Sequence, residues 1–167
     1  MTSHRTATTI DSPIGALTLV ATDGVLAGLY MHEQRHAPPA EAHGESDPVA
    51  FGSVTEQLDA YFRGELTEFD VPLAMEGTAF RQRVWAALRE IPYGETRSYG
   101  QIAARIGQPA ASRAVGLANG RNPIAIIVPC HRVVGADGRL TGYGGGLPRK
   151  QHLLALEQRA LETHPFG

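Results

Sequence analysis

The sequence IAIIVPCHRVV, residues 124–134, is the stretch around which the rest of the chain is best interpreted. Its first half is a run of mostly β-branched apolar residues, a pattern that predicts a buried strand. Pro129 ends the run, and Cys130, His131 and Arg132 follow it directly. The pattern therefore predicts that a strand carries the only cysteine of the chain, with two potential cations beside it, into the interior.

Cys130 has two interpretations. Burial in apolar surroundings raises the pKa of a thiol, and most unpaired cysteines are inert packing residues of that kind. A neighbouring cation favours the thiolate, which is the nucleophilic form. Because His131 and Arg132 directly follow Cys130 in sequence, a reactive cysteine is the alternative hypothesis to an inert one.

Charge is divided unevenly along the chain. The net charge is −2, but residues 1–80 hold 3 basic and 12 acidic side chains, whereas residues 81–150 hold 11 basic and 3 acidic ones. Of the 15 basic residues 14 are arginine, which suits phosphate and groove contacts. The basic part predicts a surface for a polyanion. The alternative is that the two oppositely charged parts attract each other.

Composition excludes several classes of protein. A hydrophobic content of 43% over 167 residues can bury a core in one large or two small domains. One cysteine excludes an intramolecular disulfide and a cysteine-rich zinc site. No apolar run resembles a signal peptide or spans a membrane, so a cytoplasmic protein is expected. The histidines expected at the surface are His4, His32, His36 and His43.

The first part of the chain predicts a sheet with one covering helix. Residues 6–31 alternate like strands, and the turn at 22–24 predicts a hairpin. Residues 35–48 have too little apolar content to pack and are expected to form a mobile loop. Ser53 and Glu56 have capping-box spacing ahead of a helix that Gly64 ends. Residues 1–70 show no constellation for chemistry, so we expect them to act as a scaffold.

The second part predicts helices and a helix-turn-helix. Thr78 caps a helix that closes at Pro92, with Trp85 expected in the core. Ser98 and Gln101 form another capping box, ahead of a helix that Gly107 ends. A short connection leads to a second helix over 111–119. The expected fold is α+β, with a sheet-and-helix domain over 1–76 and a mainly helical domain over 77–167.

The second helix of this pair is poor in long polar side chains. For reading base edges it offers mainly Arg113 and Asn119. Small residues around one arginine suit a helix that approaches a narrow groove while one side chain enters the base stack. Tyr99, on the first helix, is either a core aromatic or part of this surface.

Glu157 is the most informative residue of the last helix, predicted over 148–161. It shares the apolar face of that helix with Leu153, Leu154 and Leu161. A buried carboxylate is costly unless it is paired. Lys150 and Arg159 are possible local partners. His131 is the chemically interesting one, because a glutamate that orients a histidine beside a cysteine forms a nucleophile, base and orienter set.

The chain resembles the O6-alkylguanine-DNA alkyltransferases, also called methylated-DNA–protein-cysteine methyltransferases. The resemblance runs from about Thr78 to Glu157 and rests first on VPCHRVV at 128–134. The other matching segments are YGETRSY at 93–99, SRAVG at 112–116, NP at 122–123 and GYGGGL at 142–147.

The resemblance implies a ribonuclease-H-like N-terminal domain and a helix-turn-helix that binds the minor groove of double-stranded DNA. Arg113 would fill the gap left by an extruded guanine, and Tyr99 would assist extrusion and protonate the departing base. Asn122 would brace the link to the active-site segment. The implied DNA contacts are Tyr99, Gln108, Arg113, Ala114, Gly116 and Asn119. The implied pocket residues are Asn122, Val133, Tyr143, Gly144 and Gly145.

The implied activity is direct repair of O6-alkylguanine, with Cys130, His131, Glu157 and Tyr99 as catalytic residues. The alkyl group would stay on Cys130, so each molecule would act once and would need no cofactor. A monomer is also expected. No metal site is expected, because the chain lacks the additional cysteines that hold a structural zinc in some members of the family. Two alternatives remain. A cysteine hydrolase or thiol-redox enzyme could use the same residues but would turn over. A protein that binds damaged DNA without repairing it would not need Cys130.

Overall fold

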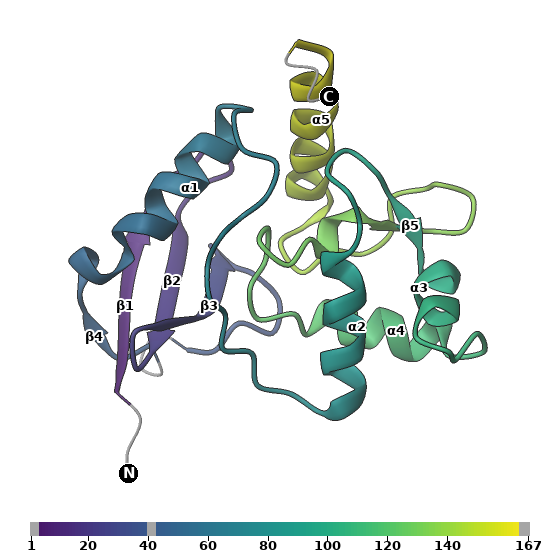
Figure 1. The fold of residues 1–167 in the computed structure, drawn as a ribbon, viewed down its shortest axis with the longest axis horizontal. Coiled ribbons are helices and arrows are strands. Elements are labelled where there is room, and N and C mark those ends of the chain that lie inside the picture. Colours follow the sequence, from purple (N-terminus) through teal and green to yellow (C-terminus); the bar gives the residue numbers. More distant parts are fainter. Residues whose placement is uncertain (1–3, 40–42, 164–167) are drawn as a thin grey trace.

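The structure, a computed structural model, describes residues 4–39 and 43–163. Its N-terminal half is a four-stranded sheet in the order β3-β2-β1-β4 (Figure 1). The first three strands pair antiparallel, and the short β4 pairs parallel with β1. The strands are β1 (Arg5–Ile10), β2 (Leu17–Thr22), β3 (Val25–Met31) and β4 (Glu45–Ser46).

The predicted hairpin between β2 and β3 is confirmed. Asp23 and Gly24 have φ angles of 49° and 82°, the pair of positive values that a tight hairpin turn requires. Alternate side chains of the strands enter the core, so Leu17, Leu19 and Leu29 are fully buried. The loop predicted over 35–48 contains β4, and residues 40–42 lie outside the described part.

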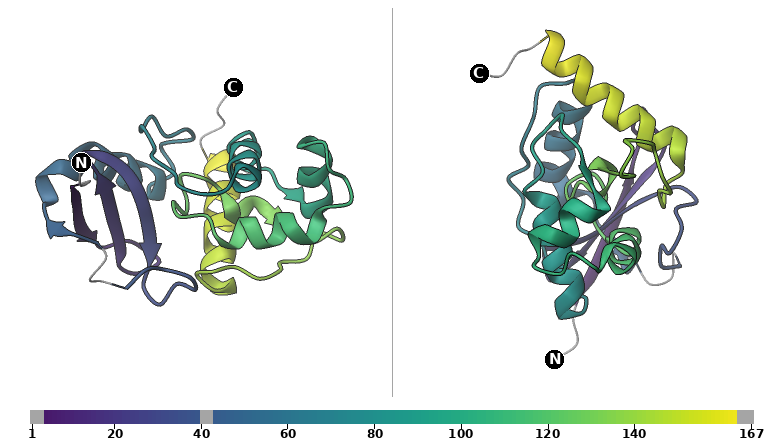
Figure 2. Two further views of the ribbon diagram at one scale, coloured as in Figure 1. Left: turned by 90° about the horizontal axis from the view of Figure 1, so that it is seen from below. Right: turned by 90° about the vertical axis from the view of Figure 1, so that its right-hand side faces the viewer.

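Helix α1 (Gly52–Phe62) lies across one face of the sheet (Figures 1 and 2). The capping box predicted at Ser53 is wrong. A 3-10 helix over Pro48–Phe51 runs directly into α1, so that α1 begins at Gly52, before Ser53. The Ser53 hydroxyl instead accepts a hydrogen bond from the Gln57 side chain. Gly64, with a φ of 75°, follows the end of the helix as expected.

The C-terminal half is mainly helical, and its predicted caps are confirmed. Thr78 accepts from the backbone N–H of Arg81, and Ser98 and Gln101 form the reciprocal capping box. The indole N–H of Trp85 donates to the Ala118 carbonyl across a buried helix contact. The elements are α2 (Ala79–Arg89), β5 (Arg97–Ser98), α3 (Tyr99–Arg105), α4 (Ser112–Gly120), β6 (Val133–Val134) and α5 (Leu147–Thr163).

The strand predicted over the apolar run from 124 is wrong. Ile124 makes an isolated bridge to Leu29, the next residues turn, and only β6 at the far end pairs with a strand. Ile126 has a φ of 71°, which is rare for a β-branched residue. The Asn122 side chain supplies hydrogen bonds that a neighbouring strand would otherwise make: its amide donates to the Val128 carbonyl and accepts from the Ile124 N–H. The composition of the run reflects complete burial rather than an extended backbone.

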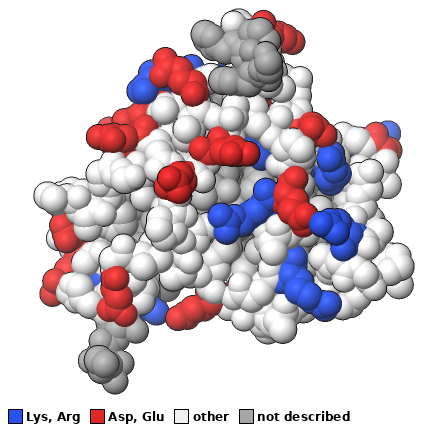
Figure 3. All heavy atoms as spheres, viewed as in Figure 1, with Lys and Arg blue, Asp and Glu red and all other residues white. Residues whose placement is uncertain are grey.

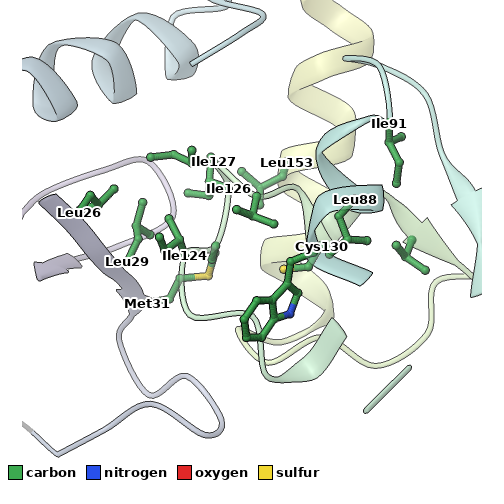
Figure 4. Packing of buried hydrophobic residues seen from close by; sticks show 14 of the residues in the cluster. Leu26, Leu29, Met31, Leu88, Ile91, Ile124, Ile126, Ile127, Cys130 and Leu153 are labelled. Atoms are coloured by element: carbon green, nitrogen blue, oxygen red, sulfur yellow. The ribbon is translucent and has the colours of Figure 1, made fainter. Parts of the chain in front are cut away.

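This buried run joins the two halves of the molecule. Leu29 of β3 donates its N–H to the Pro123 carbonyl, and its own carbonyl accepts from Ala125. Figure 4 shows side chains of β3 packed beside the run, and both belong to one continuous hydrophobic cluster. Those labelled in this contact are Leu26, Leu29, Met31, Ile124, Ile126 and Ile127. The division into domains at 76/77 stays a prediction, but the core is shared across it.

Within residues 4–39 and 43–163, no helix combines the length and the apolar character needed to cross a membrane.

We predict that Ile124→Ala lowers the free energy of unfolding by about 2–5 kcal/mol, because it empties a fully buried site between the two halves. Urea unfolding measures the change. Val49→Ala is the matched control, since Val49 is 88% exposed and its loss should shift stability by less than about 0.5 kcal/mol. Amide exchange should show β2, β3 and α2 opening together; independent opening of the sheet would contradict a shared core.

Candidate active site

The site is built around the carboxylate of Glu157, which is fully buried on α5. Its Oε2 accepts from His131 Nε2 at 2.7 Å, from Tyr61 Oη at 2.7 Å and from Arg132 Nη2 at 3.0 Å. Its Oε1 accepts from Arg132 Nε at 2.9 Å and from the Gly94 N–H at 3.1 Å. The expected pairing of Glu157 with His131 is therefore confirmed.

Two of the partners considered for Glu157 do not bind it. Lys150 donates instead to the carbonyls of Val133, at 2.6 Å, and Thr141, at 3.2 Å. Arg159 is exposed. Tyr61 was not foreseen, although it falls on the buried stripe of α1 with Val54 and Leu58, and a buried phenol needs a hydrogen-bond partner.

Glu157 is held as an anion. Burial raises its pKa, but the hydrogen bonds and charges of His131 and Arg132 outweigh burial and lower the pKa to about 2. The carboxylate is therefore ionised and acts only as an acceptor, so the proton of the His131–Glu157 bond lies on Nε2.

His131 is fully buried, and its other ring nitrogen is unoccupied. Burial lowers the pKa of His131, the bond and charge of Glu157 raise it, and the shift is downward on balance. The resting ring is thus neutral, with Nε2 protonated. Nδ1 has no hydrogen-bond partner among the described residues. This nitrogen is free to accept a proton.

The surroundings of Cys130 differ from the sequence prediction. Arg132 does not flank the sulfur, because its guanidinium is bound by Glu157 and by the Ile91 carbonyl at 2.8 Å. Residues 130–132 form one 3-10 turn, in which successive side chains point about 120° apart. Against the effect of burial, the side chains of Asn122 and Tyr143, and then the charge of Lys150, lower the pKa of the thiol.

Burial nevertheless raises the pKa of the Cys130 thiol on balance. The side chain is 6% exposed, and it is the only free cysteine of the chain. The resting sulfur is therefore protonated, and a base must remove its proton when it reacts.

Cys130 lines a cavity of about 320 Å³, within the range of small-molecule pockets. Tyr99, Asn122, Tyr143 and the glycines at 142, 144 and 145 also line it, as the predicted pocket requires. Val133 does not; it is buried beside the cavity, and its carbonyl holds Lys150. The cavity is also lined by Gly116, Leu117 and Gly120 of α4 and by Arg121 directly after it.

One wall of the cavity comes from the N-terminal half, which the sequence presented as scaffold. Gln34, Arg35 and His36 line the cavity, and the Arg35 N–H donates to the Gly144 carbonyl at 2.8 Å. Arg149 of α5 reinforces the contact by donating to the carbonyls of Ile14 and His32. These contacts involve backbone atoms, so no residue pattern indicates them.

The predicted DNA-contacting residues divide into two groups. Gln108, Arg113 and Ala114 are exposed, and Gly116 is half-buried against the ring of Tyr99. Asn119 instead points inward: it is 6% exposed, and its amide donates to the Cys130 carbonyl at 3.4 Å. Tyr99 is half-buried at the cavity, with its hydroxyl 2.7 Å from Thr141 Oγ1.

Charge on the surface follows the asymmetry of the sequence. Figure 3 shows acidic side chains spread over the half formed by the sheet and α1, while basic ones gather mostly over the helical half. In the described part of the chain, no group of three or more histidine, cysteine, aspartate or glutamate side chains is arranged to hold a metal ion.

Two family models match the chain. Residues 6–75 match the ribonuclease-like domain of 6-O-methylguanine DNA methyltransferase, and residues 79–159 match its DNA-binding domain. The methylated-DNA–protein-cysteine methyltransferase of Mycolicibacterium paratuberculosis is 64% identical over 151 residues, 90% of this chain and 91% of that protein. The enzyme of the same name from Mycobacterium tuberculosis is 65% identical over 150 residues, 90% of each chain.

A solved structure agrees with these matches. The crystal structure of the Mycobacterium tuberculosis OGT protein in complex with DNA has a TM-score of 0.89 and 62% sequence identity to this chain. The superposition covers 93% of this chain and 94% of that one. The predicted α+β fold, with its sheet-containing and helical halves, is confirmed.

We predict that Glu157→Gln costs about 3–5 kcal/mol of stability, because it leaves the buried Arg132 guanidinium without its anion. Urea unfolding at neutral pH measures the loss. The control is Glu90→Gln, which removes an exposed ion pair with Arg105 and should cost less than about 1 kcal/mol. Equal effects of the two changes would contradict the paired burial of Glu157.

The same network predicts a pH dependence of stability. The folded pKa of Glu157, about 2, lies below its ordinary value of 4.5. Its contribution is therefore present above the ordinary value and is lost as pH falls toward the folded one. In unfolding experiments between these two values, wild type should lose stability more steeply than Glu157→Gln; parallel curves would contradict this linkage.

Proposed function

The chain belongs to the 6-O-methylguanine DNA methyltransferase family, and on that premise we propose that it repairs O6-alkylguanine in DNA by transferring the alkyl group to Cys130. One observation carries the proposal. The single cysteine lines a ligand-sized cavity, and the histidine that follows it is oriented by a buried glutamate with one ring nitrogen left free. In the proposed arrangement Cys130 is the nucleophile, His131 the base and Glu157 the group that orients the base.

The first step removes the thiol proton. His131 Nδ1 takes the proton of Cys130, through one bridging water, and the resulting imidazolium is stabilised by Glu157 at Nε2. The ammonium of Lys150 stabilises the thiolate as it forms. Because the thiol is protonated at rest and the residue is only 6% exposed, the nucleophile is generated where competing reactions with solvent are limited.

The second step transfers the alkyl group. The Cys130 sulfur attacks the alkyl carbon, a C–S bond forms, and the bond from that carbon to guanine O6 breaks with its electron pair left on the base. Tyr99, whose hydroxyl lies at the cavity beside Thr141, donates a proton to the departing guanine. The product on the protein is a thioether. No group in the chain can reverse this bond, so each molecule acts once and needs no cofactor.

The target base must leave the duplex to reach the sulfur. We propose that α4 lies in the minor groove and that the exposed Arg113 occupies the space of the extruded guanine. The exposed Gln108 and Ala114 adjoin the same surface, and Gly116 lets the helix approach closely. In this proposal a monomer acts on double-stranded DNA in the cytoplasm.

Two rivals share parts of this site. A cysteine hydrolase could use Cys130, His131 and Glu157, but it would not need a cavity lined in part by the second helix of a helix-turn-helix. A protein that only binds damaged DNA would not need a cysteine in the cavity or a histidine with a free ring nitrogen. Each rival differs from the proposed function in the outcome it predicts when the protein is exposed to the lesion.

We predict that duplex DNA containing O6-methylguanine adds the mass of one methylene to the protein, with a limit of one per chain. Intact-mass spectrometry checks this. Cys130→Ser should bind the duplex without gaining mass. Binding by wild type without a mass change supports the damage-binding rival, and product formed beyond one equivalent supports a hydrolase.

We predict that Arg113→Ala slows transfer from duplex DNA by about 10²-fold or more, because the extruded state loses the side chain that fills the stack. Reaction with free O6-benzylguanine should be unchanged, since the free base needs no extrusion. Arg63→Ala is the control for charge, because Arg63 is exposed on the sheet half and paired with Glu65. Equal loss with duplex and free base would contradict the role of Arg113 in extrusion.

A further inference from the structure

The hydrogen bond between Tyr61 and Glu157 crosses from one half of the molecule to the other. Tyr61 is on α1, in the half that carries no other side chain of the Glu157 network. Its side chain is fully buried, and its hydroxyl donates at 2.7 Å to Glu157 Oε2, 96 positions along the chain. The same oxygen accepts the Nε2 proton of His131 at 2.7 Å.

We propose that Tyr61 is a positioning residue for alkyl transfer, which sets the basicity of His131 by sharing the Glu157 oxygen that holds its proton. The inference rests on the proposed function, in which His131 is the base. It assigns to the N-terminal half a part in the proton transfer, in addition to its contribution to the cavity wall.

Glu157 Oε2 receives more hydrogen bonds than a carboxylate oxygen readily accepts. A carboxylate oxygen has about two lone-pair sites, yet Glu157 Oε2 receives Tyr61, His131 and Arg132 Nη2. Each donor draws negative charge from the oxygen and weakens its bonds to the others. Without the Tyr61 hydroxyl, Glu157 would hold the His131 proton more strongly and favour the imidazolium, so Nδ1 would be a neutral acceptor only at higher pH.

Tyr61 can perform this role at every pH at which the protein works. Burial, and then the charge and hydrogen bond of Glu157, raise the pKa of the phenol well above its ordinary value. The hydroxyl thus stays a donor while His131 titrates. The titratable and charged groups that face this network are Cys130 and Arg132 of the 3-10 turn, Tyr93 after α2, Tyr143 of the glycine loop, and Lys150 and Glu157 of α5.

The ring of Tyr61 also packs in an aromatic cluster, and this purely structural role must be separated from that of the hydroxyl. The ring centroid lies 5.4 Å from Phe62, 5.5 Å from Phe69 and 6.2 Å from Tyr93. Tyr61→Phe keeps the ring and removes only the donor. A structural role predicts a loss of stability, or the same loss of rate at every pH. The positioning role predicts a change that depends on pH.

The test is the single-turnover rate of methyl transfer from an O6-methylguanine duplex, measured from about pH 5 to about pH 9 for wild type and Tyr61→Phe. The acid limb should move to higher pH in the variant, giving a rate about 3- to 10-fold lower near its midpoint and within about twofold on the alkaline plateau. Tyr30→Phe is the control; Tyr30 is half-buried on β3, outside the network, and its profile should match wild type. An unmoved limb, or equal slowing at all pH values, would overturn the inference.

A second measurement separates this inference from the proposed function. In unreacted protein, the His131 ring can be titrated by NMR without DNA, and its pKa should be higher in Tyr61→Phe than in wild type. If wild type gains no methylene, the proposed function fails, while the titration still reports on Tyr61. If wild type transfers methyl but neither the titration nor the rate profile moves, Tyr61 has no positioning role and the function stands.

Discussion

The buried carboxylate of Glu157 is the feature on which the rest of the structure depends. It accepts hydrogen bonds from α1, from the turn after α2 and from the 3-10 turn that contains the cysteine, while it is itself part of α5. A buried anion must have such partners to be tolerable. The requirement therefore fixes the segments around the sulfur and leaves His131 in one orientation. Stability and reactivity thus share one group.

The parts of this arrangement that sequence predicts are those with local causes. Thr78, Ser98 and Gln101 mark helix starts because their side chains bond N–H groups three residues away. The burial of Glu157 can be predicted because it shares a helical face with leucines. Since burying an unpaired carboxylate is costly, a partner for it can be predicted as well. His131 follows from that prediction, since it is the titratable group next to the cysteine.

The parts that sequence does not predict depend on contacts between distant segments. Residues 124–128 are as apolar as a strand, yet they turn, because burial by both halves determines their composition and the Asn122 side chain supplies their hydrogen bonds. Arg132 and Lys150 exchange expected roles: the neighbour of the sulfur in sequence binds Glu157, and the lysine of α5 acts on the thiol. The cavity wall at 34–36 is joined through backbone atoms, which leave no residue signature.

A neutral His131 with its proton on Nε2 is the central claim, because His131 can take the thiol proton only if Nδ1 is free to accept it. Long-range ¹⁵N correlation NMR of the histidine rings in the unreacted protein tests this claim most directly. At neutral pH, we expect His131 to show a protonated Nε2 and an unprotonated Nδ1. A proton on Nδ1, whether in the other neutral tautomer or in an imidazolium, would contradict it.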